Sequence, residues 1–90
     1  VDLDARIARA LETSRTQGAF VRSVDDGSPA AAAGVEPYDI LVGISGEPVT
    51  SATDYVARIY DFRPGDKVTL DVERGGRVQR LLLQIGRAQR

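Results

Sequence analysis

The 90-residue sequence contains no cysteine, histidine, methionine or tryptophan. Without cysteine and histidine the chain has no disulfides, no thiolate or imidazole metal ligands and no imidazole for acid–base catalysis. A Ser-His-Asp triad is therefore excluded, and a Ser-Lys pair would depend on Lys67, the single lysine, at an outward strand position. We expect no cofactor, no metal site and no catalytic activity in this chain.

Long apolar runs and a charge excess are also absent. No run approaches the roughly 20 apolar residues that span a bilayer, and the N-terminus VDLDARIARA is too charged for a signal peptide. With 12 basic and 13 acidic residues, the net charge of −1 gives no field that draws the domain onto nucleic acid or membrane. The arginines towards the C-terminus lack an aromatic stacking platform, so we interpret them as a solvated strand face.

The stretch Gly18–Pro48 carries the clearest local signals. Ser28 followed by Pro29 predicts the start of a one-turn helix, and Gly34 predicts its end. Apolar residues before and after it predict strands at Ala19–Val24 and Ile40–Ile44. The acidic pair before Gly27 lacks the further oxygen ligands of a calcium loop, so it predicts a turn.

The flanking segments predict two longer helices and a hairpin. Asp4–Glu12 has helical spacing, with Asp4 as N-cap, and Val49 and Thr50 continue a short strand before the next helix. Ser51, with Asp54 three residues later, predicts the start of a helix over Ala52–Phe62 that has surplus apolar surface. Strict alternation, a Gly-Gly turn and a returning apolar strand predict the closing hairpin, at Lys67–Arg74 and Val78–Ile85.

This order of elements predicts an α+β domain. At this length we expect a small, partly open antiparallel sheet barrel flanked by two helices and a one-turn helix. Residues 1–86 are expected to form a single domain and residues 87–90 a C-terminal tail.

The segment GAFVRSVDDGSPAAAAGVEPYDILVGISGEPV resembles the central signature of PDZ domains, in the form that bacterial HtrA/Deg serine proteases carry. The preceding DARIARAL and the following RPGDKVTLDVERGGR resemble the extra N-terminal helix and the closing hairpin of that type. The resemblance extends from about Asp4 to Gly86. It implies a periplasmic or extracytoplasmic bacterial protein that acts in protein quality control.

The sequence departs from the family pattern in two respects. Tyr38 stands where the family has glycine in Pro-Gly-Asp, and because a side chain disfavours a type II turn we expect a type I turn. The family also has a Gly-Leu-Gly-Ile-like loop, whose amides hold a ligand carboxylate, ahead of the first helix. Only Val1, Asp2 and Leu3 precede Asp4. We therefore expect either a fragment cut after that loop or a domain without a full carboxylate cradle.

The resemblance implies peptide binding by β-augmentation, in which an extended ligand adds to a strand edge beside the helix over 52–62. It assigns the peptide-binding role to Leu3, Ile7, Asp54, Tyr55, Val56, Arg58 and Ile59. A core role for Ile59 and a simple capping role for Asp54 are the alternatives.

Three functions are weighed. The first is a module that binds apolar C-termini or unfolded segments for an attached or partner protease. The second is a scaffold or regulatory contact between domains or subunits, with a closed or incomplete groove. The third is an enzyme, which the missing histidine disfavours. No nucleic acid partner and no membrane insertion by this domain are expected.

Overall fold

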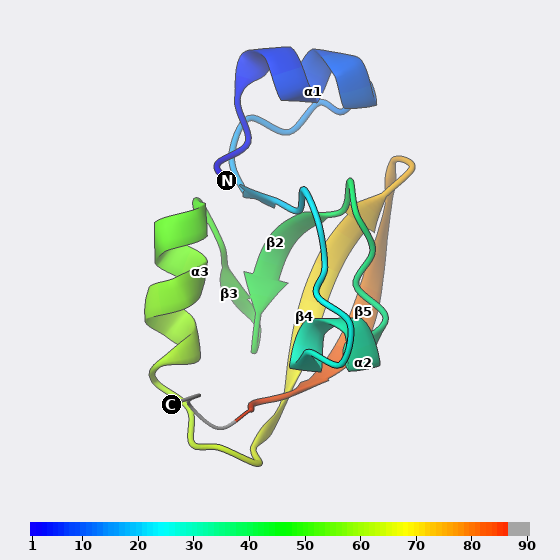
Figure 1. Cartoon of the computed structure of the whole chain (residues 1–90). Helices are drawn as coiled ribbons and strands as arrows, with labels where there is room; N and C mark the ends of the chain where they lie inside the picture. The colour runs from blue at the N-terminus through cyan, green and yellow to red at the C-terminus, as the bar shows by residue number, and fades with distance from the viewer. Residues whose placement is uncertain (87–90) are drawn as a thin grey trace.

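The computed structural model describes residues 1–86, so the tail expected at 87–90 lies outside the described residues. Five antiparallel strands form one sheet in the order β1-β2-β4-β5, and β3 pairs with β2 (Figure 1). The elements are α1 (Ala5–Leu11), β1 (Ala19–Phe20), α2 (Pro29–Ala33), β2 (Ile40–Ile44), β3 (Glu47–Pro48), α3 (Ala52–Ile59), β4 (Lys67–Arg74) and β5 (Arg77–Gln84). The predicted α+β fold is confirmed.

The core lies between the sheet and the helices that flank it. The alternation in β4 has the predicted effect, because Val68, Leu70 and Val72 are all buried. Ile44 of β2 is buried beside them, and one side of α3 packs against this core. In Figure 1, α3 flanks the sheet on one side, α2 lies against β5, and α1 stands apart at the N-terminal end.

The short helix α2 is set by its two ends. The Ser28 hydroxyl accepts a hydrogen bond from the Ala31 amide at 3.1 Å, and Gly34 ends the helix with a φ of 97°. The turn between β4 and β5 is also set by the residues within it, because Gly75 and Gly76 both have positive φ, at 59° and 81°. Both features are as the sequence predicts.

Two elements are shorter than expected. Strand β1 ends at Phe20 and not at Val24, because the Val21 amide and carbonyl pair with the turn at residues 38 and 39 and the ladder stops there. Helix α3 ends at Ile59 and not at Phe62, because the amides of Asp61 and Phe62 bond three residues back and tighten the chain into a turn. The short strand expected at Val49 and Thr50 lies instead at Glu47–Pro48.

The turn at Tyr38 was predicted wrongly. Tyr38 has a φ of 75°, which is the value of a type II turn and not of a type I turn. The chain adopts it because Asp39 must be placed in the interior, where its carboxylate accepts a hydrogen bond from the Glu36 amide at 2.8 Å. Tertiary contacts at Asp39 therefore override the local preference of tyrosine.

The longest helix among residues 1–86 is α3, with eight residues, and no helix in this part of the chain is long and apolar enough to cross a membrane.

Candidate functional site

A groove runs along α3 and consists of two hollows of about 430 Å³ each. The first hollow is bounded on one side by α3 and on the other by β1 and the segment that follows β1. Its lining includes Val1, residues 19–25 and Ala52. The second lies between α3, the start of α2 and the end of β5, and its lining includes Pro29, Leu83 and Ile85. Both hollows are lined by Tyr55 and Val56, so they lie next to each other along α3.

One face of α3 supplies a wall of this groove. Its groove-lining residues recur at helical spacing, three or four positions apart, and are Ala52, Tyr55, Val56, Ile59 and Tyr60. Tyr55 and Ile59 are half-buried and also pack against the core. Val56 is 50% exposed and Tyr60 is 81% exposed, so the helix presents unpartnered apolar surface to the groove.

The opposite wall contains backbone groups that have no partner. Phe20 exchanges both of its hydrogen bonds with Val1, at 2.7 and 3.1 Å. Within residues 1–86, the backbone groups of residues 22–24 make no hydrogen bond. These backbone groups line the first hollow, beside α3.

The Tyr55 side chain adds a polar group between the two hollows. Burial raises the pKa of its phenol above the ordinary value, which keeps the hydroxyl protonated at neutral pH. A neutral hydroxyl both donates and accepts hydrogen bonds. The hydroxyl of Tyr55 thus joins that of Ser28, which also lines both hollows, as a polar group between mainly apolar walls.

The predicted capping residues hold the N-terminal end of α3. The Ser51 hydroxyl accepts a hydrogen bond from the Asp54 amide at 3.0 Å, while the Asp54 carboxylate accepts one from the Thr50 amide at 2.9 Å. The bond from Thr50, together with the ion pair to Arg58 at 3.2 Å, holds the pKa of Asp54 below its usual value. Asp54 is therefore ionised at neutral pH.

The structure brings together three of the seven residues assigned to peptide binding. Tyr55, Val56 and Ile59 line the groove. The other four line neither hollow: Leu3 is buried, Ile7 belongs to α1, and Asp54 and Arg58 lie on the opposite side of α3.

Sequence reasoning missed several groove residues. Tyr60 and Phe62 belong to the predicted helix with surplus apolar surface, and that signal was sufficient to include them. Pro29, Leu83 and Ile85 come from segments far from α3 in sequence, and no local pattern connects them with that helix.

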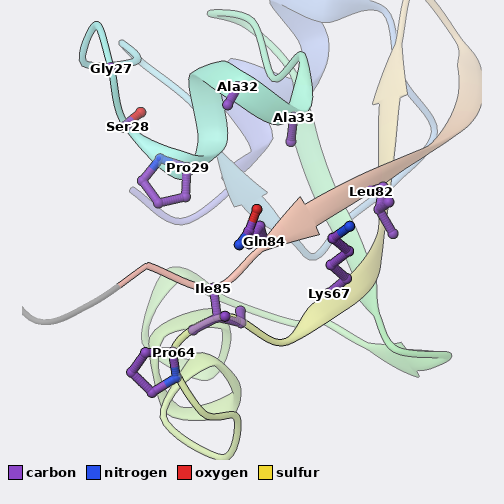
Figure 2. Close-up of a pocket in the computed structure, with 11 residues that line it drawn as sticks. Gly27, Ser28, Pro29, Ala32, Ala33, Pro64, Lys67, Leu82, Gln84 and Ile85 are labelled. Atoms are coloured by element: carbon purple, nitrogen blue, oxygen red, sulfur yellow. The ribbon is translucent and has the colours of Figure 1, made fainter.

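A larger hollow of about 670 Å³ lies on the other side of α2. Figure 2 shows that Pro29, Ala32 and Ala33 face it from α2, with Lys67 and Gln84 opposite. It contains no residue of α3 and mixes a charged and an amide side chain with apolar ones. No group of three or more acidic side chains gathers as a metal site among residues 1–86.

Comparison with known proteins agrees with this geometry. A family model described as PDZ domain matches residues 7–85. The periplasmic pH-dependent serine endoprotease DegQ of Escherichia coli K12 is 38% identical over 76 residues, which cover 84% of this chain and 17% of DegQ. A putative zinc metalloprotease of Brucella suis biovar 1 is 47% identical over 59 residues, which cover 66% of this chain and 15% of that protein.

A solved structure titled HtrA-type protease AlgW with decapeptide matches the whole chain, with a TM-score of 0.87 and 26% identity, over 28% of that structure's chain. This chain therefore spans about one sixth of its curated relatives' length. DegQ is named as a periplasmic protein, in agreement with the location expected from the sequence. The chain belongs to the PDZ domain family, in the form carried by HtrA and DegP-like proteases.

Proposed function

We propose that this domain binds extended peptides, either apolar C-termini or unfolded segments, in the groove along α3. The observation that supports this most directly is the open backbone edge at residues 22–24, which lies opposite the exposed face of α3. Main-chain hydrogen bonds along such an edge supply affinity, and pockets beside it select alternate side chains. The two apolar hollows provide those pockets.

The bound peptides are proposed to serve a protease that lies elsewhere in the same protein or in a partner. DegQ and the Brucella relative are both named as proteases, and this chain corresponds to a small part of each. The chain itself has no histidine and therefore no Ser-His-Asp triad. Its contribution is to recognise the substrate or a regulatory peptide, while cleavage occurs on another domain.

A scaffold function is the second candidate, and one observation favours it. The apolar face of α3 is exposed, with Val56 50% and Tyr60 81% exposed, and another domain or subunit would cover such a surface equally well. A domain with such a groove would contact another domain or subunit without holding a peptide.

A peptide titration separates the two functions. The probes are fluorescein-labelled decapeptides whose last three residues are drawn from Val, Leu, Phe, Tyr and Ala, each with a free carboxylate and as the C-terminal amide. Fluorescence polarisation is measured with this chain and with a longer form that carries the preceding residues of its parent protein. Binding tighter than millimolar by either form supports the peptide function, and its absence in both overturns it in favour of the scaffold.

A charge placed in the groove checks the site. Val56→Asp is expected to weaken binding by about tenfold or more, because it desolvates a carboxylate in an apolar pocket. Val78→Asp is the matched control, since Val78 is 54% exposed on β5 and Val56 is 50% exposed. Both variants should keep the fold. Equal affinity of the two variants would exclude the groove as the binding site.

A further inference from the structure

We propose that Asp2 is a positioning residue of the groove, whose carboxylate sets the separation between the edge of the sheet and the N-terminal end of α3. This inference rests on the peptide-binding function proposed above. It concerns a residue that contacts the wall of the groove through a hydrogen bond and that was not assigned to the site from the sequence.

The backbone on either side of Asp2 is fixed to the sheet. Val1 exchanges two hydrogen bonds with Phe20, and the Leu3 amide donates to the Gly18 carbonyl at 2.9 Å. Asp2 lies opposite Ala19 in an antiparallel bridge between these bonded positions. Its own amide and carbonyl therefore point away from β1, as alternation in an antiparallel pair requires. Asp2 belongs to the sheet side of the groove.

The Asp2 side chain reaches the opposite wall. Its Oδ1 accepts a hydrogen bond from the Ala52 amide at 2.8 Å, across 50 residues of sequence. Ala52 is the first residue of α3, where amides have no partner within the helix. Ser51 satisfies the Asp54 amide and leaves the Ala52 amide for Asp2. A carboxylate at this position also interacts favourably with the helix dipole.

The position of α3 depends strongly on such ties because no residue of the helix is fully buried. At the other end, the turn after α3 is fixed to the end of β5 by two backbone bonds: Gly65 donates to Ile85 at 2.8 Å, and Ile85 donates to Asp66 at 2.7 Å. Each end of the groove wall is thus tied to a strand. At the N-terminal end the Gly18 amide donates to the Thr50 carbonyl at 3.2 Å, and the Asp2 side chain adds the tie that reaches α3 itself, at Ala52.

The tie also borders the groove directly. Val1 and Ala52, which lie on the two sides of the Asp2 bridge, both line the first hollow. A hydrogen bond weakens steeply when its geometry departs from the ideal, so a ligand that pairs with the sheet edge and packs on α3 requires a constant separation of the walls. Loss of the bridge is expected to let α3 move relative to the edge and to reduce affinity without unfolding the domain.

The test compares three variants of the full chain. Asp2→Ala removes the tie, and Asp2→Asn keeps a side-chain oxygen that accepts from the same amide. Asp4→Ala is the matched control: the Asp4 carboxylate accepts from the Ile7 amide at 2.9 Å and caps α1, which lines neither hollow. Affinity is measured with the decapeptide of the panel above that binds the unmodified chain most tightly. Hydrogen exchange of the Ala52 amide is followed by NMR in the free protein.

Asp2→Ala is expected to raise Kd by about fivefold, the equivalent of one helix cap, and to accelerate exchange at Ala52. Asp2→Asn and Asp4→Ala should stay within about twofold of the unmodified chain, a difference below one helix cap. Unchanged affinity or unchanged Ala52 exchange in Asp2→Ala overturns the proposal, as does an equal loss in Asp4→Ala. If the unmodified chain binds no decapeptide, the proposed peptide function itself is wrong. If the unmodified chain binds and Asp2→Ala binds equally well, only the role of Asp2 is wrong.

Discussion

The Arg74 guanidinium holds the buried carboxylate of Asp39 with two hydrogen bonds, from Nε to Oδ1 at 2.8 Å and from Nη2 to Oδ2 at 2.7 Å. Asp39 is 0% exposed, and Nη2 of Arg74 also donates to the Gly34 carbonyl at 2.8 Å. The hydrogen bonds and the charge of Asp39 raise the pKa of Arg74 above its ordinary value. One guanidinium thus connects the end of β4 with the end of α2 and the following turn.

Arg74→Ala is expected to lower the free energy of unfolding by about 3 kcal/mol, because it leaves a buried carboxylate without its partner. The measurement is urea unfolding followed by circular dichroism at neutral pH. Arg77→Ala, at the exposed start of β5, serves as the control and should change stability by less than about 0.5 kcal/mol. Similar losses in the two variants would contradict the role of the Asp39 pair.

Glu73 makes stability depend on pH. Burial by itself would raise the pKa of Glu73, but hydrogen bonds from Thr13 and Arg15 outweigh it and hold the pKa below the ordinary value of 4.5. A carboxylate with a depressed pKa stabilises the fold above its unfolded-state pKa, and this contribution is lost as the pH falls through the folded-state pKa. The loss therefore begins near pH 4.5 and continues below it.

Glu73→Gln is expected to destabilise the domain by about 2 kcal/mol at pH 7, the scale of a hydrogen bond to a charged group. The difference from the unmodified chain should shrink as the pH is lowered below 4.5. Urea unfolding at a series of pH values measures both effects. A difference that stays constant with pH would show that the charge of Glu73 does not contribute.

Tyr38 carries backbone strain, since its φ of 75° lies in the region that favours glycine. Tyr38→Gly is expected to be more stable than Tyr38→Ala by about 1 kcal/mol, because both remove the ring and only alanine keeps the strain. Comparing these two variants also cancels the loss of the contact between the Tyr38 and Phe20 rings, whose centroids are 6.1 Å apart. Thermal unfolding measures the difference, and equal stability would argue against strain at this turn.

Gly18 allows a close approach between the segment before β1 and β2. A Cβ atom at Gly18 would lie 2.7 Å from Ile40 Cγ2 and 3.1 Å from the Leu41 carbonyl oxygen, at a φ of 147°. Gly18→Ala is therefore expected to cost about 2 to 3 kcal/mol in unfolding free energy, through overpacking and backbone strain.

Gly27→Ala is the control for this substitution. Gly27 also has a positive φ, of 77°, but a Cβ there meets nothing within 4 Å. Its cost should be limited to backbone strain, about 1 kcal/mol. A smaller loss in Gly18→Ala than in Gly27→Ala would mean that β2 moves to accept the methyl group.

Much of the groove could be foreseen and part of it could not. Val56 and Ile59, which the family resemblance assigned to peptide binding, line the groove. Asp54 and Arg58 were assigned to peptide binding as well, yet they lie on the opposite side of the helix. Their position follows from the direction in which α3 packs against the sheet, which its own sequence leaves open because apolar residues occupy more than one stripe.

The sequence by itself determined the features whose causes are local. Ser28 and Gly34 bound α2, the paired glycines turn the hairpin, and alternation directs the side chains of β4 into the core. Tertiary structure alone decided the Asp39–Arg74 pair across 35 residues, the Asp2–Ala52 tie across 50, and the positive φ of Tyr38. A cap or a turn is selected by neighbours along the chain, whereas these contacts exist only once strand register and helix packing have brought distant residues within hydrogen-bond distance.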